Sequence, residues 1–278
     1  MTWVASARMY AVAPGAATAW RALLEEVGRR AEVALEVIEH AFPASLADLW
    51  ARPDLGCAFM CGWPYALETR RAVAETPPRL PRPLLAAPVP RAAWSAGAPL
   101  YRSDFVVAAT SGFQSLESTF GTRFAFNALG SHSGVNMPRA HLARWAGQAP
   151  LFSEQVGPLT TPRRCIEAVA SGAAEVTAVD SYALQLLQAH DPDLARRIRI
   201  IASTEPNPIP PLVAAAALDD FDLTRLRDTL TSLHQDPASR TLLAPLCLLG
   251  FATVSASDYD ATLAVEAEAL AAGYPALC

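Results

Sequence analysis

Two proline-rich stretches constrain the fold of this chain more than any other feature of its sequence. The first covers residues 76–99 and holds seven prolines, and the second is the Thr-Glu-Pro-Asn-Pro-Ile-Pro-Pro run at 204–211. Proline fixes φ and lacks a backbone N–H, so such stretches favour extended connections over helices and central strands. Two rigid crossings, near 99–103 and 203–211, bracket a middle block with strand and helix patterns of its own. This is the pattern expected of a chain that leaves one lobe, builds a second and returns.

The chain's length and element order agree with this division. Its 278 residues suit two lobes better than one small core. Segments 3–12 and 35–39 read as strands, and the segment between them, 16–34, carries apolar residues at helical spacing. Because strand, helix and strand alternate, we predict an α/β fold with two hinge crossings. The predicted domains are 1–100 for the first lobe, 101–205 for the second, and 206–278 for the return to the first.

Further elements follow along the chain. We predict strands within 55–60, 84–89, 105–108, 123–127, 174–179, 194–201 and 212–217. We predict helices within 46–50, 111–121, 138–145 and 163–171, and two or three more after 217. The segment Cys61–Tyr65 is predicted to be a loop that follows a strand. In open α/β sheets ligands bind at this end of the strands.

Composition excludes several classes of protein. Apolar residues make up 52 %, which supports a packed core, and a net charge of -5 lacks the basic footprint of a nucleic-acid binder. All 22 basic residues are arginine, so Schiff-base, P-loop and Ser–Lys chemistry are excluded. The five cysteines and five histidines lack metal-ligand spacing, so we expect neither metal nor cofactor. No apolar run is long enough for a membrane span.

The start of the sequence leaves the compartment open. Met1-Thr2-Trp3-Val4 leads directly into the first predicted strand, without the regions typical of an export signal. Two alternatives stand: the protein is cytoplasmic, or its signal lies outside this numbering.

A serine-rich turn is the strongest candidate for ligand binding. Ser131, His132, Ser133 and Gly134 lie where a helix is predicted to begin. A helix start offers unpaired amides and a partial positive charge, serine hydroxyls add donors, and glycine lets an anion approach the backbone. This combination suits phosphate or phosphonate. Thr161 repeats the arrangement before a later helix. The alternative at both positions is a simple helix cap.

An enzyme is the least favoured alternative. The segment from Gly130 to Gly134 resembles a nucleophile elbow, but its central residue is His132. Adjacent residues such as His132 and Ser133 are poorly placed for proton transfer, and no base for a cysteine nucleophile is evident. We therefore expect that the protein is not an enzyme.

Other polar and aromatic residues at predicted loop edges extend the candidate site. Tyrosine O–H groups at positions 10, 65 and 101 can donate to an oxyanion, and Trp63 can line one wall, although core packing is the alternative for each. Asp180, at a strand end, is a candidate partner for a ligand amine or a cap for the next helix.

These segments together resemble the PhnD-like phosphate, phosphite and phosphonate solute-binding proteins of ABC transporters. The matching pieces occur in the family's order: Met9-Tyr10, Cys61-Gly62-Trp63-Pro64-Tyr65, Tyr101 with Ser103, Asn127 with Ser131–Asn136, Ile166–Asp180 and Pro206–Pro210. Where family members often have a ligand histidine, this chain has Thr160-Thr161-Pro162.

The resemblance implies a type II periplasmic-binding-protein fold with a ligand cleft between two lobes. By position, it implies that Ser131, Ser133 and Tyr101 hold an oxyanion, that Tyr10 and Trp63 contribute from the first lobe, and that Asp180 faces the ligand's organic end. The remaining candidate ligand residues are Tyr65, Ser103, Asn127, His132, Gly134 and Thr161. The implied partner is an ABC transporter permease, the implied compartment is the periplasm, and a monomer is expected. The alternative function is a cytoplasmic or partner-linked sensor of another small metabolite.

Overall fold

The computed structural model describes residues 1–148 and 150–277, which form two compact units. Unit 1 contains residues 1–100 and 208–260, and unit 2 contains residues 101–207 and those from 261 onward. Each unit has its own sheet, so the α/β prediction is confirmed.

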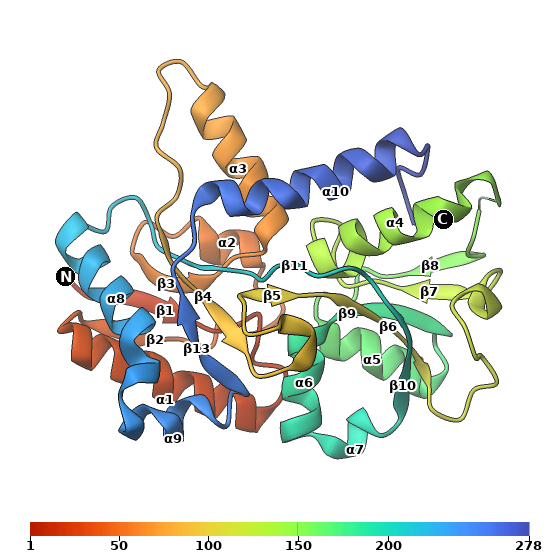
Figure 1. Cartoon of the computed structure of the whole chain (residues 1–278), viewed down its shortest axis with the longest axis horizontal. Coiled ribbons are helices and arrows are strands. Elements are labelled where there is room, and N and C mark those ends of the chain that lie inside the picture. The colour runs from red at the N-terminus through yellow and green to blue at the C-terminus, as the bar shows by residue number, and fades with distance from the viewer. Residues whose placement is uncertain (149, 278) are drawn as a thin grey trace. The chain divides into compact units, whose positions relative to one another are not determined.

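The sheet of unit 1 is mixed and has six strands in the order β13-β4-β12-β3-β1-β2 (Figure 1). Strand β1 pairs in parallel with both β2 and β3, while β12 runs antiparallel to β3 and β4. The strands are β1 (Trp3–Ser6), β2 (Leu35–Val37), β3 (Leu55–Phe59), β4 (Leu84–Pro90), β12 (Leu212–Val213) and β13 (Leu248–Ala252). The three parallel strands therefore end at one edge of this sheet.

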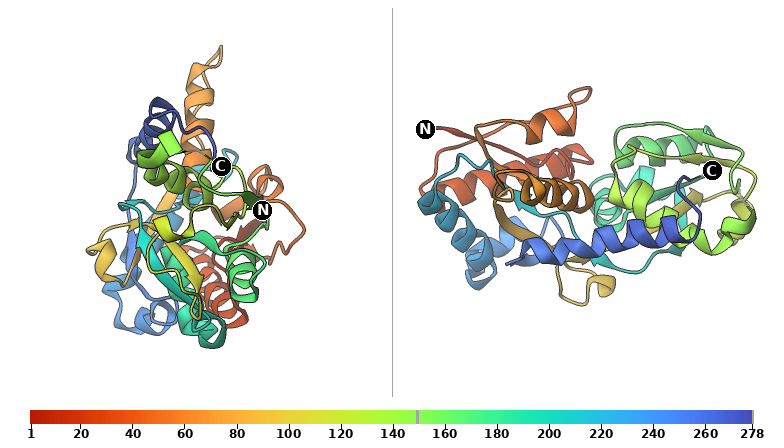
Figure 2. Two further views of the ribbon diagram at one scale, coloured as in Figure 1. Left: turned by 90° about the vertical axis from the view of Figure 1, so that its right-hand side faces the viewer. Right: turned by 90° about the horizontal axis from the view of Figure 1, so that it is seen from above.

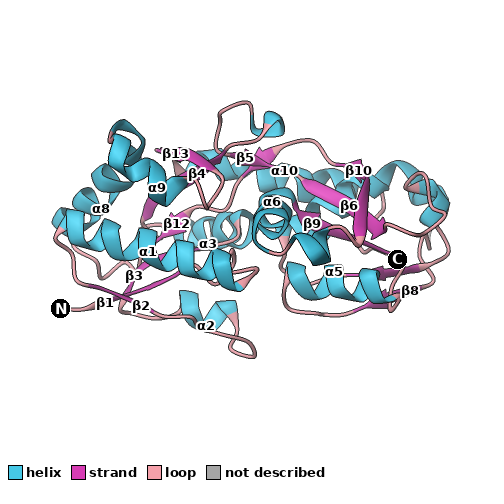
Figure 3. Ribbon diagram, turned by 90° about the horizontal axis from the view of Figure 1, so that it is seen from below, coloured by secondary structure: helices cyan, strands magenta, loops and turns pink. Residues whose placement is uncertain are grey.

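Helices cover this sheet on its faces (Figure 3). They are α1 (Pro14–Ala31), α2 (Leu46–Trp50), α3 (Gly62–Ala74), α8 (Asp220–Ser232) and α9 (Arg240–Leu243). Helix α1 packs beside α8 and buries the apolar stripe that predicted it, with Trp20 and Leu24 fully buried. Helix α3 and the loop after it project from the rest of unit 1 (Figure 2).

The sheet of unit 2 has five strands in the order β10-β6-β9-β7-β8. Strands β7, β8 and β9 run parallel, and β6 runs antiparallel to β9 and β10. The strands are β6 (Ser103–Ala108), β7 (Arg123–Ala125), β8 (Glu154–Val156), β9 (Val176–Asp180) and β10 (Ile198–Ser203). A separate pair, β5 (Leu100–Tyr101) and β11 (Asn207–Pro208), joins the two predicted crossings.

The helices of unit 2 include one wide turn. A π-helical segment, His132–Asn136, runs directly into α4 (Met137–Leu142). The other helices are α5 (Pro162–Ser171), α6 (Ser181–His190), α7 (Pro192–Ala195) and α10 (Asp260–Ala271).

Short 3-10 turns occur in both units, at Ala93–Ser95, Glu117–Thr119, Ala143–Gln148, Leu233–Gln235, Pro237–Ser239 and Ala256–Tyr259. Within the described residues no helix is long and apolar enough to cross a membrane.

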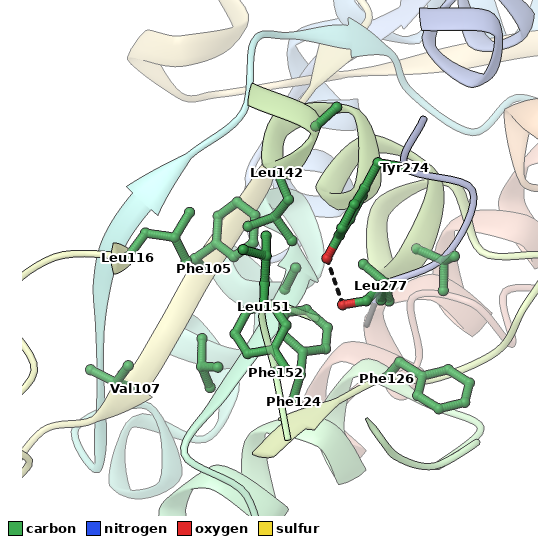
Figure 4. Close-up of a cluster of buried hydrophobic side chains, with 14 residues drawn as sticks. Phe105, Val107, Leu116, Phe124, Phe126, Leu142, Leu151, Phe152, Tyr274 and Leu277 are labelled. Carbon is green, nitrogen blue, oxygen red and sulfur yellow. Dashed lines mark hydrogen bonds between the residues drawn. The ribbon is translucent and has the colours of Figure 1, made fainter. Parts of the chain in front are cut away.

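The end of the chain belongs to the core of unit 2, which corrects one predicted boundary. Tyr274 and Leu277 are buried among Phe105, Phe124 and Phe152, and the Tyr274 hydroxyl donates to the Leu277 carbonyl at 2.8 Å (Figure 4). Residues from 261 onward therefore group with unit 2, and not with the first lobe as predicted. The sequence pattern shows that this segment is helical but not which core its apolar residues enter.

Some local predictions are also wrong. Cys61–Tyr65 is not a loop, because Cys61 is the N-cap of α3 and Pro64 lies in its first turn, where a missing N–H costs little. The helical pattern within 111–121 forms only the Glu117–Thr119 turn. Strand β13, which pairs with β4, was not predicted.

We expect Tyr274→Ala to destabilise unit 2 strongly. The substitution removes a fully buried ring and leaves a cavity in the core, so the free energy of unfolding should fall by about 3–5 kcal/mol. Urea denaturation would measure this change. Leu270→Ala is the matched control, because Leu270 is exposed on the same segment, and an equal effect of the two substitutions would contradict the assignment of this segment to the core.

Candidate functional site

Ser131 caps the helical segment that begins at His132. Its hydroxyl oxygen accepts from the Gly134 amide at 2.9 Å, and its carbonyl accepts from both Val135 and Asn136 at 3.1 Å. The capping alternative is therefore realised at this serine. Because the hydroxyl oxygen accepts here, its own proton stays available for donation to a ligand.

Ser133 lies in the first turn of the same segment, and its polar groups are less committed. Among the described residues, none pairs with its hydroxyl, although its side chain is 7 % exposed. Its amide is one of the helix-start amides that have no intrahelical acceptor. Ser133 thus offers two adjacent donors at the positive end of a helical segment.

Asn127 borders this turn and explains the glycine in it. A Cβ added at Gly134 would lie 2.0 Å from the Asn127 Oδ1 and 3.0 Å from the Ser131 hydroxyl oxygen. The same Oδ1 accepts from the Ala128 amide at 2.9 Å, so it cannot move aside freely. The structure therefore brings Asn127, Ser131 and Gly134 together, and their predicted ligand contacts stay a prediction.

Ser103 supports this turn from strand β6. Its hydroxyl donates to the Ser133 carbonyl at 2.7 Å and contacts the Met137 sulfur at 3.6 Å. Since Ser103 is fully buried, it fixes the backbone of Ser133 and is not itself exposed to a ligand.

His132 is fully buried in a network of amides. Its Nδ1 accepts from the Asn136 Nδ2 at 3.0 Å, and its Nε2 lies 3.1 Å from the Asn207 Oδ1. The Asn136 Nδ2 also donates to the Thr262 carbonyl at 3.0 Å, and the Asn136 Oδ1 accepts from Arg139 at 2.9 Å. These partners assign the Nε2–H tautomer to a neutral ring. Burial lowers the pKa of His132 to about 4.

Tyr101 lies beside this network. Its ring centroid is 6.3 Å from that of His132, and its side chain is fully buried. Tyr101 and Asn207 are the residues at which the first segment of unit 2 begins and ends, and Thr262 is near the start of its second segment. The His132 network therefore ties the ends of both segments of unit 2 to the turn that carries the serines.

Thr161 and Asp180 act as helix caps. The Thr161 hydroxyl oxygen accepts from the Arg164 amide at 3.2 Å at the start of α5. The Asp180 Oδ1 accepts from the Tyr182 and Ala183 amides at 2.8 and 2.9 Å at the start of α6. Capping was the alternative interpretation of both residues, and ligand contacts by either stay a prediction.

The aromatic candidates of unit 1 are buried. Tyr10 packs edge-on against Phe59 with ring centroids 4.8 Å apart, and Tyr65 packs against Tyr259 at 5.3 Å. Trp63, in the first turn of α3, is 8 % exposed. Core packing is thus the observed role of both tyrosines within unit 1, and their ligand contacts stay a prediction.

The sequence interpretation missed Arg8, which follows strand β1. Its side chain is partly buried, and its Nε is fully buried without a hydrogen-bond partner in the described residues. Burial lowers the pKa of its guanidinium, and no carboxylate offsets this effect. A solvent-facing arginine and an unpaired one look the same in sequence, so no pattern could have identified it.

The geometry gives no support to a serine or cysteine nucleophile. Both ring nitrogens of His132 are engaged by asparagine amides. Burial raises the pKa of Cys57 and of Cys165 to about 12, so these thiols stay protonated and are poor nucleophiles. The described residues contain no cluster of histidine, cysteine and carboxylate side chains that could hold a metal ion.

One comparison with known proteins shows the family of this chain, and another shows its fold. Residues 15–259 match the model of a family described as ABC transporter, phosphonate, periplasmic substrate-binding protein. No curated protein matches the chain.

Solved structures match nearly the whole chain. A binding protein component of an ABC phosphonate transporter from Pseudomonas aeruginosa superposes with a TM-score of 0.78 at 17% identity, covering 98% of this chain and 88% of that one. PhnD1 from Prochlorococcus marinus in complex with methylphosphonate gives 0.77 at 14% identity, covering 96% and 97%. A Xanthomonas citri protein bound to ATP gives 0.63 at 17% identity, covering 98% of each chain. These likenesses establish the two-lobed binding-protein fold.

Replacing Ser131 and Ser133 separately should give different effects on stability. Ser131→Ala removes a helix cap and should lower the free energy of unfolding by about 1 kcal/mol. Ser133→Ala removes a hydroxyl without a protein partner and should change it by less than about 0.5 kcal/mol. Chemical denaturation of both variants measures the difference, and equal losses would show that the Ser133 hydroxyl is structural.

Stability should fall in mild acid because of His132. The folded-state pKa of about 4 lies below the usual 6.5, so the unfolded chain binds this proton more readily. The contribution of the neutral imidazole to the free energy of unfolding is fully present above pH 6.5. It is lost as the pH falls toward 4, at about 1.4 kcal/mol per pH unit. In His132→Gln, the free energy of unfolding measured by denaturation should depend less steeply on pH between these values.

Two other histidines serve as references for that measurement. The pKa of His141 is also lowered by burial to about 4, so part of the slope should persist in His132→Gln. His234→Gln alters an exposed histidine and should leave the slope unchanged. If His132→Gln keeps the full slope, the buried neutral imidazole is not its source.

Proposed function

We propose a function from one premise: the chain belongs to the family of periplasmic substrate-binding proteins of phosphonate ABC transporters. The protein captures a small phosphorus oxyanion, of the phosphonate or phosphate class, for transport. The observation that carries this proposal is the cluster of unused donors at the start of the His132–Asn136 turn.

The donor set in unit 2 suits a tetrahedral oxyanion. The Ser133 hydroxyl and amide, the Ser131 hydroxyl proton and the Asn127 Nδ2 lie around one turn and have no described acceptor. Hydrogen bonds to an ionised acceptor are roughly twice as strong as neutral ones, so a few of them support micromolar affinity. The helix start adds its partial positive charge.

Supporting side chains hold these donors in place before a ligand arrives. Ser103 fixes the Ser133 carbonyl, and the His132 network fixes the turn from the other side. Preorganised donors do not lose conformational entropy on binding, which favours affinity. Asp180 caps α6, and its predicted role toward the ligand's organic end is part of this proposal.

The proposed partner and compartment follow from the family. The protein delivers its solute to an ABC transporter permease and works in the periplasm as a monomer. We propose no catalytic activity.

A second candidate is the binding of another anionic metabolite on the same fold. The solved structure from Xanthomonas citri bound to ATP supports it, because a nucleotide also presents phosphoryl oxygens. Both candidates use the same donor cluster, so one ligand panel compares them.

Ligand binding should stabilise the protein measurably. Thermal unfolding of ligand-stripped protein is followed with phosphate, phosphite, methylphosphonate, 2-aminoethylphosphonate, sulfate and ATP. A ligand at 100 times its Kd should add about 2.7 kcal/mol of stability. Calorimetric titration then gives the Kd of the best ligand for each variant.

Variants of the turn locate the site. Ser133→Ala should weaken the Kd about 10-fold, because it removes a hydrogen bond to a charged group. Gly134→Ala should weaken it further, because the new Cβ displaces Asn127. Ser153→Ala, at an exposed serine of the same unit, should have no effect. Stabilisation by ATP alone would favour the second candidate, and no stabilisation by any of these ligands would overturn the proposal.

A further inference from the structure

Arg8 is an exception among the arginines of this chain. Its side chain is partly buried, its Nε is inaccessible to solvent, and no side-chain hydrogen bond or ion pair to it occurs in the described residues. Its backbone amide lies 3.3 Å from the Ser6 hydroxyl oxygen, and a tight turn follows in which the Tyr10 and Ala11 amides donate to the Ala7 carbonyl. The chain therefore holds the Arg8 backbone in place while leaving its guanidinium unpaired.

The other partly or fully buried arginines of the described chain all have acceptors. Their partners are carboxylates, carbonyls or amide oxygens, as found for Arg21, Arg30, Arg52, Arg82, Arg102, Arg123, Arg139, Arg163, Arg199, Arg225 and Arg227. Removing a cation from water without a counter-charge is costly. Arg8 thus lacks the acceptors that the described residues supply to the other partly or fully buried arginines.

The position of Arg8 in the fold is where ligands bind to α/β sheets. It follows β1, which pairs in parallel with β3, with Ser6 opposite Ala58. The loops after both strands therefore lie at the same edge of the sheet, the carboxyl edge. Helix α1 begins after the first loop and α3 after the second.

This edge is electropositive for a second, independent reason. Neither α1 nor α3 has a side-chain cap or an acidic residue in its first turn. By contrast, α5, α6 and α8 start with capping by Thr161, Asp180 and Asp219. Two uncapped helix starts and one unpaired guanidinium at a single edge all favour an anion.

We infer that the carboxyl edge of the unit 1 sheet is an anion-binding subsite in which Arg8 pairs with a phosphonate or carboxylate group of the ligand. A guanidinium presents its N–H groups as a fork that matches two oxygens of either group. This inference rests on the proposed function and gives unit 1 a charged ligand contact of its own.

By this inference Arg8 increases affinity for the ligand and does not stabilise the protein in the absence of ligand. Among the residues that the structure describes, its guanidinium has no hydrogen-bond or ion-pair partner, and burial lowers its pKa. Arg8→Gln removes that unpaired charge, so it should leave the stability of the ligand-free protein unchanged or raised. A purely structural arginine would give the opposite result.

The test compares two ligands and four proteins by calorimetric titration. The ligands are methylphosphonate, which has one anionic group, and phosphonoacetate, which has a phosphonate and a carboxylate. The proteins are the full unaltered chain, Arg8→Gln, Arg8→Lys and Arg70→Gln. Arg70 is an exposed arginine on α3 and serves as the matched control. Thermal unfolding without ligand checks that each variant folds.

For Arg8→Gln we expect Kd to rise about 10- to 100-fold. We expect a smaller rise in Arg8→Lys and no change in Arg70→Gln. If Arg8→Gln loses affinity for both ligands, Arg8 pairs with the phosphonate group. If it loses affinity for phosphonoacetate alone, Arg8 pairs with the carboxylate group. Either result supports the inference. Unaltered affinity for both ligands in a folded Arg8→Gln overturns it. If the unaltered protein binds neither these two ligands nor any phosphorus oxyanion of the panel above, the proposed function fails, which is a separate result.

Discussion

The buried hydrogen bonds of His132 and Asn136 hold unit 2 together at the place where its function is proposed. The His132 imidazole donates to Asn207 and the Asn136 side-chain amide donates to the Thr262 carbonyl, partners that are 75 and 126 positions away in sequence. In a low-dielectric interior such hydrogen bonds are strong. A buried polar atom that lacks a partner there lowers the stability of the folded protein. The neutral state of His132 is therefore a condition for the position of the turn that carries Ser131 and Ser133.

Within that turn, neighbouring serines have different tasks. Ser131 uses its oxygen to begin the helix, while the buried Ser103 directs the backbone of Ser133 and leaves the Ser133 hydroxyl uncommitted. The π-helical geometry lets one carbonyl accept from two amides, which keeps the serines on a wide first turn. Chemically identical side chains are thus divided into one that builds the fold and one that stays available to a ligand.

Much of this arrangement could be predicted from sequence, because strong local patterns determine it. The apolar stripe of α1 and the possible cap at Thr161 before α5 are local signals that the structure confirms. Where two outcomes shared one pattern, as with capping or ligand contact at Asp180, the sequence left both open. The missing acceptor of Arg8 and the entry of Tyr274 into a distant core depend on tertiary neighbours, which no local pattern records.

The discontinuous core of unit 2 has a consequence for the order of folding. All residues of unit 1 have been synthesised once the ribosome passes residue 260, whereas the aromatic core of unit 2 still lacks Tyr274 and Leu277. Contacts between residues far apart in sequence form late, because a long loop must close first. Both units are discontinuous, but unit 1 is complete at residue 260, whereas unit 2 reaches its native packing only when Tyr274 and Leu277 join its core.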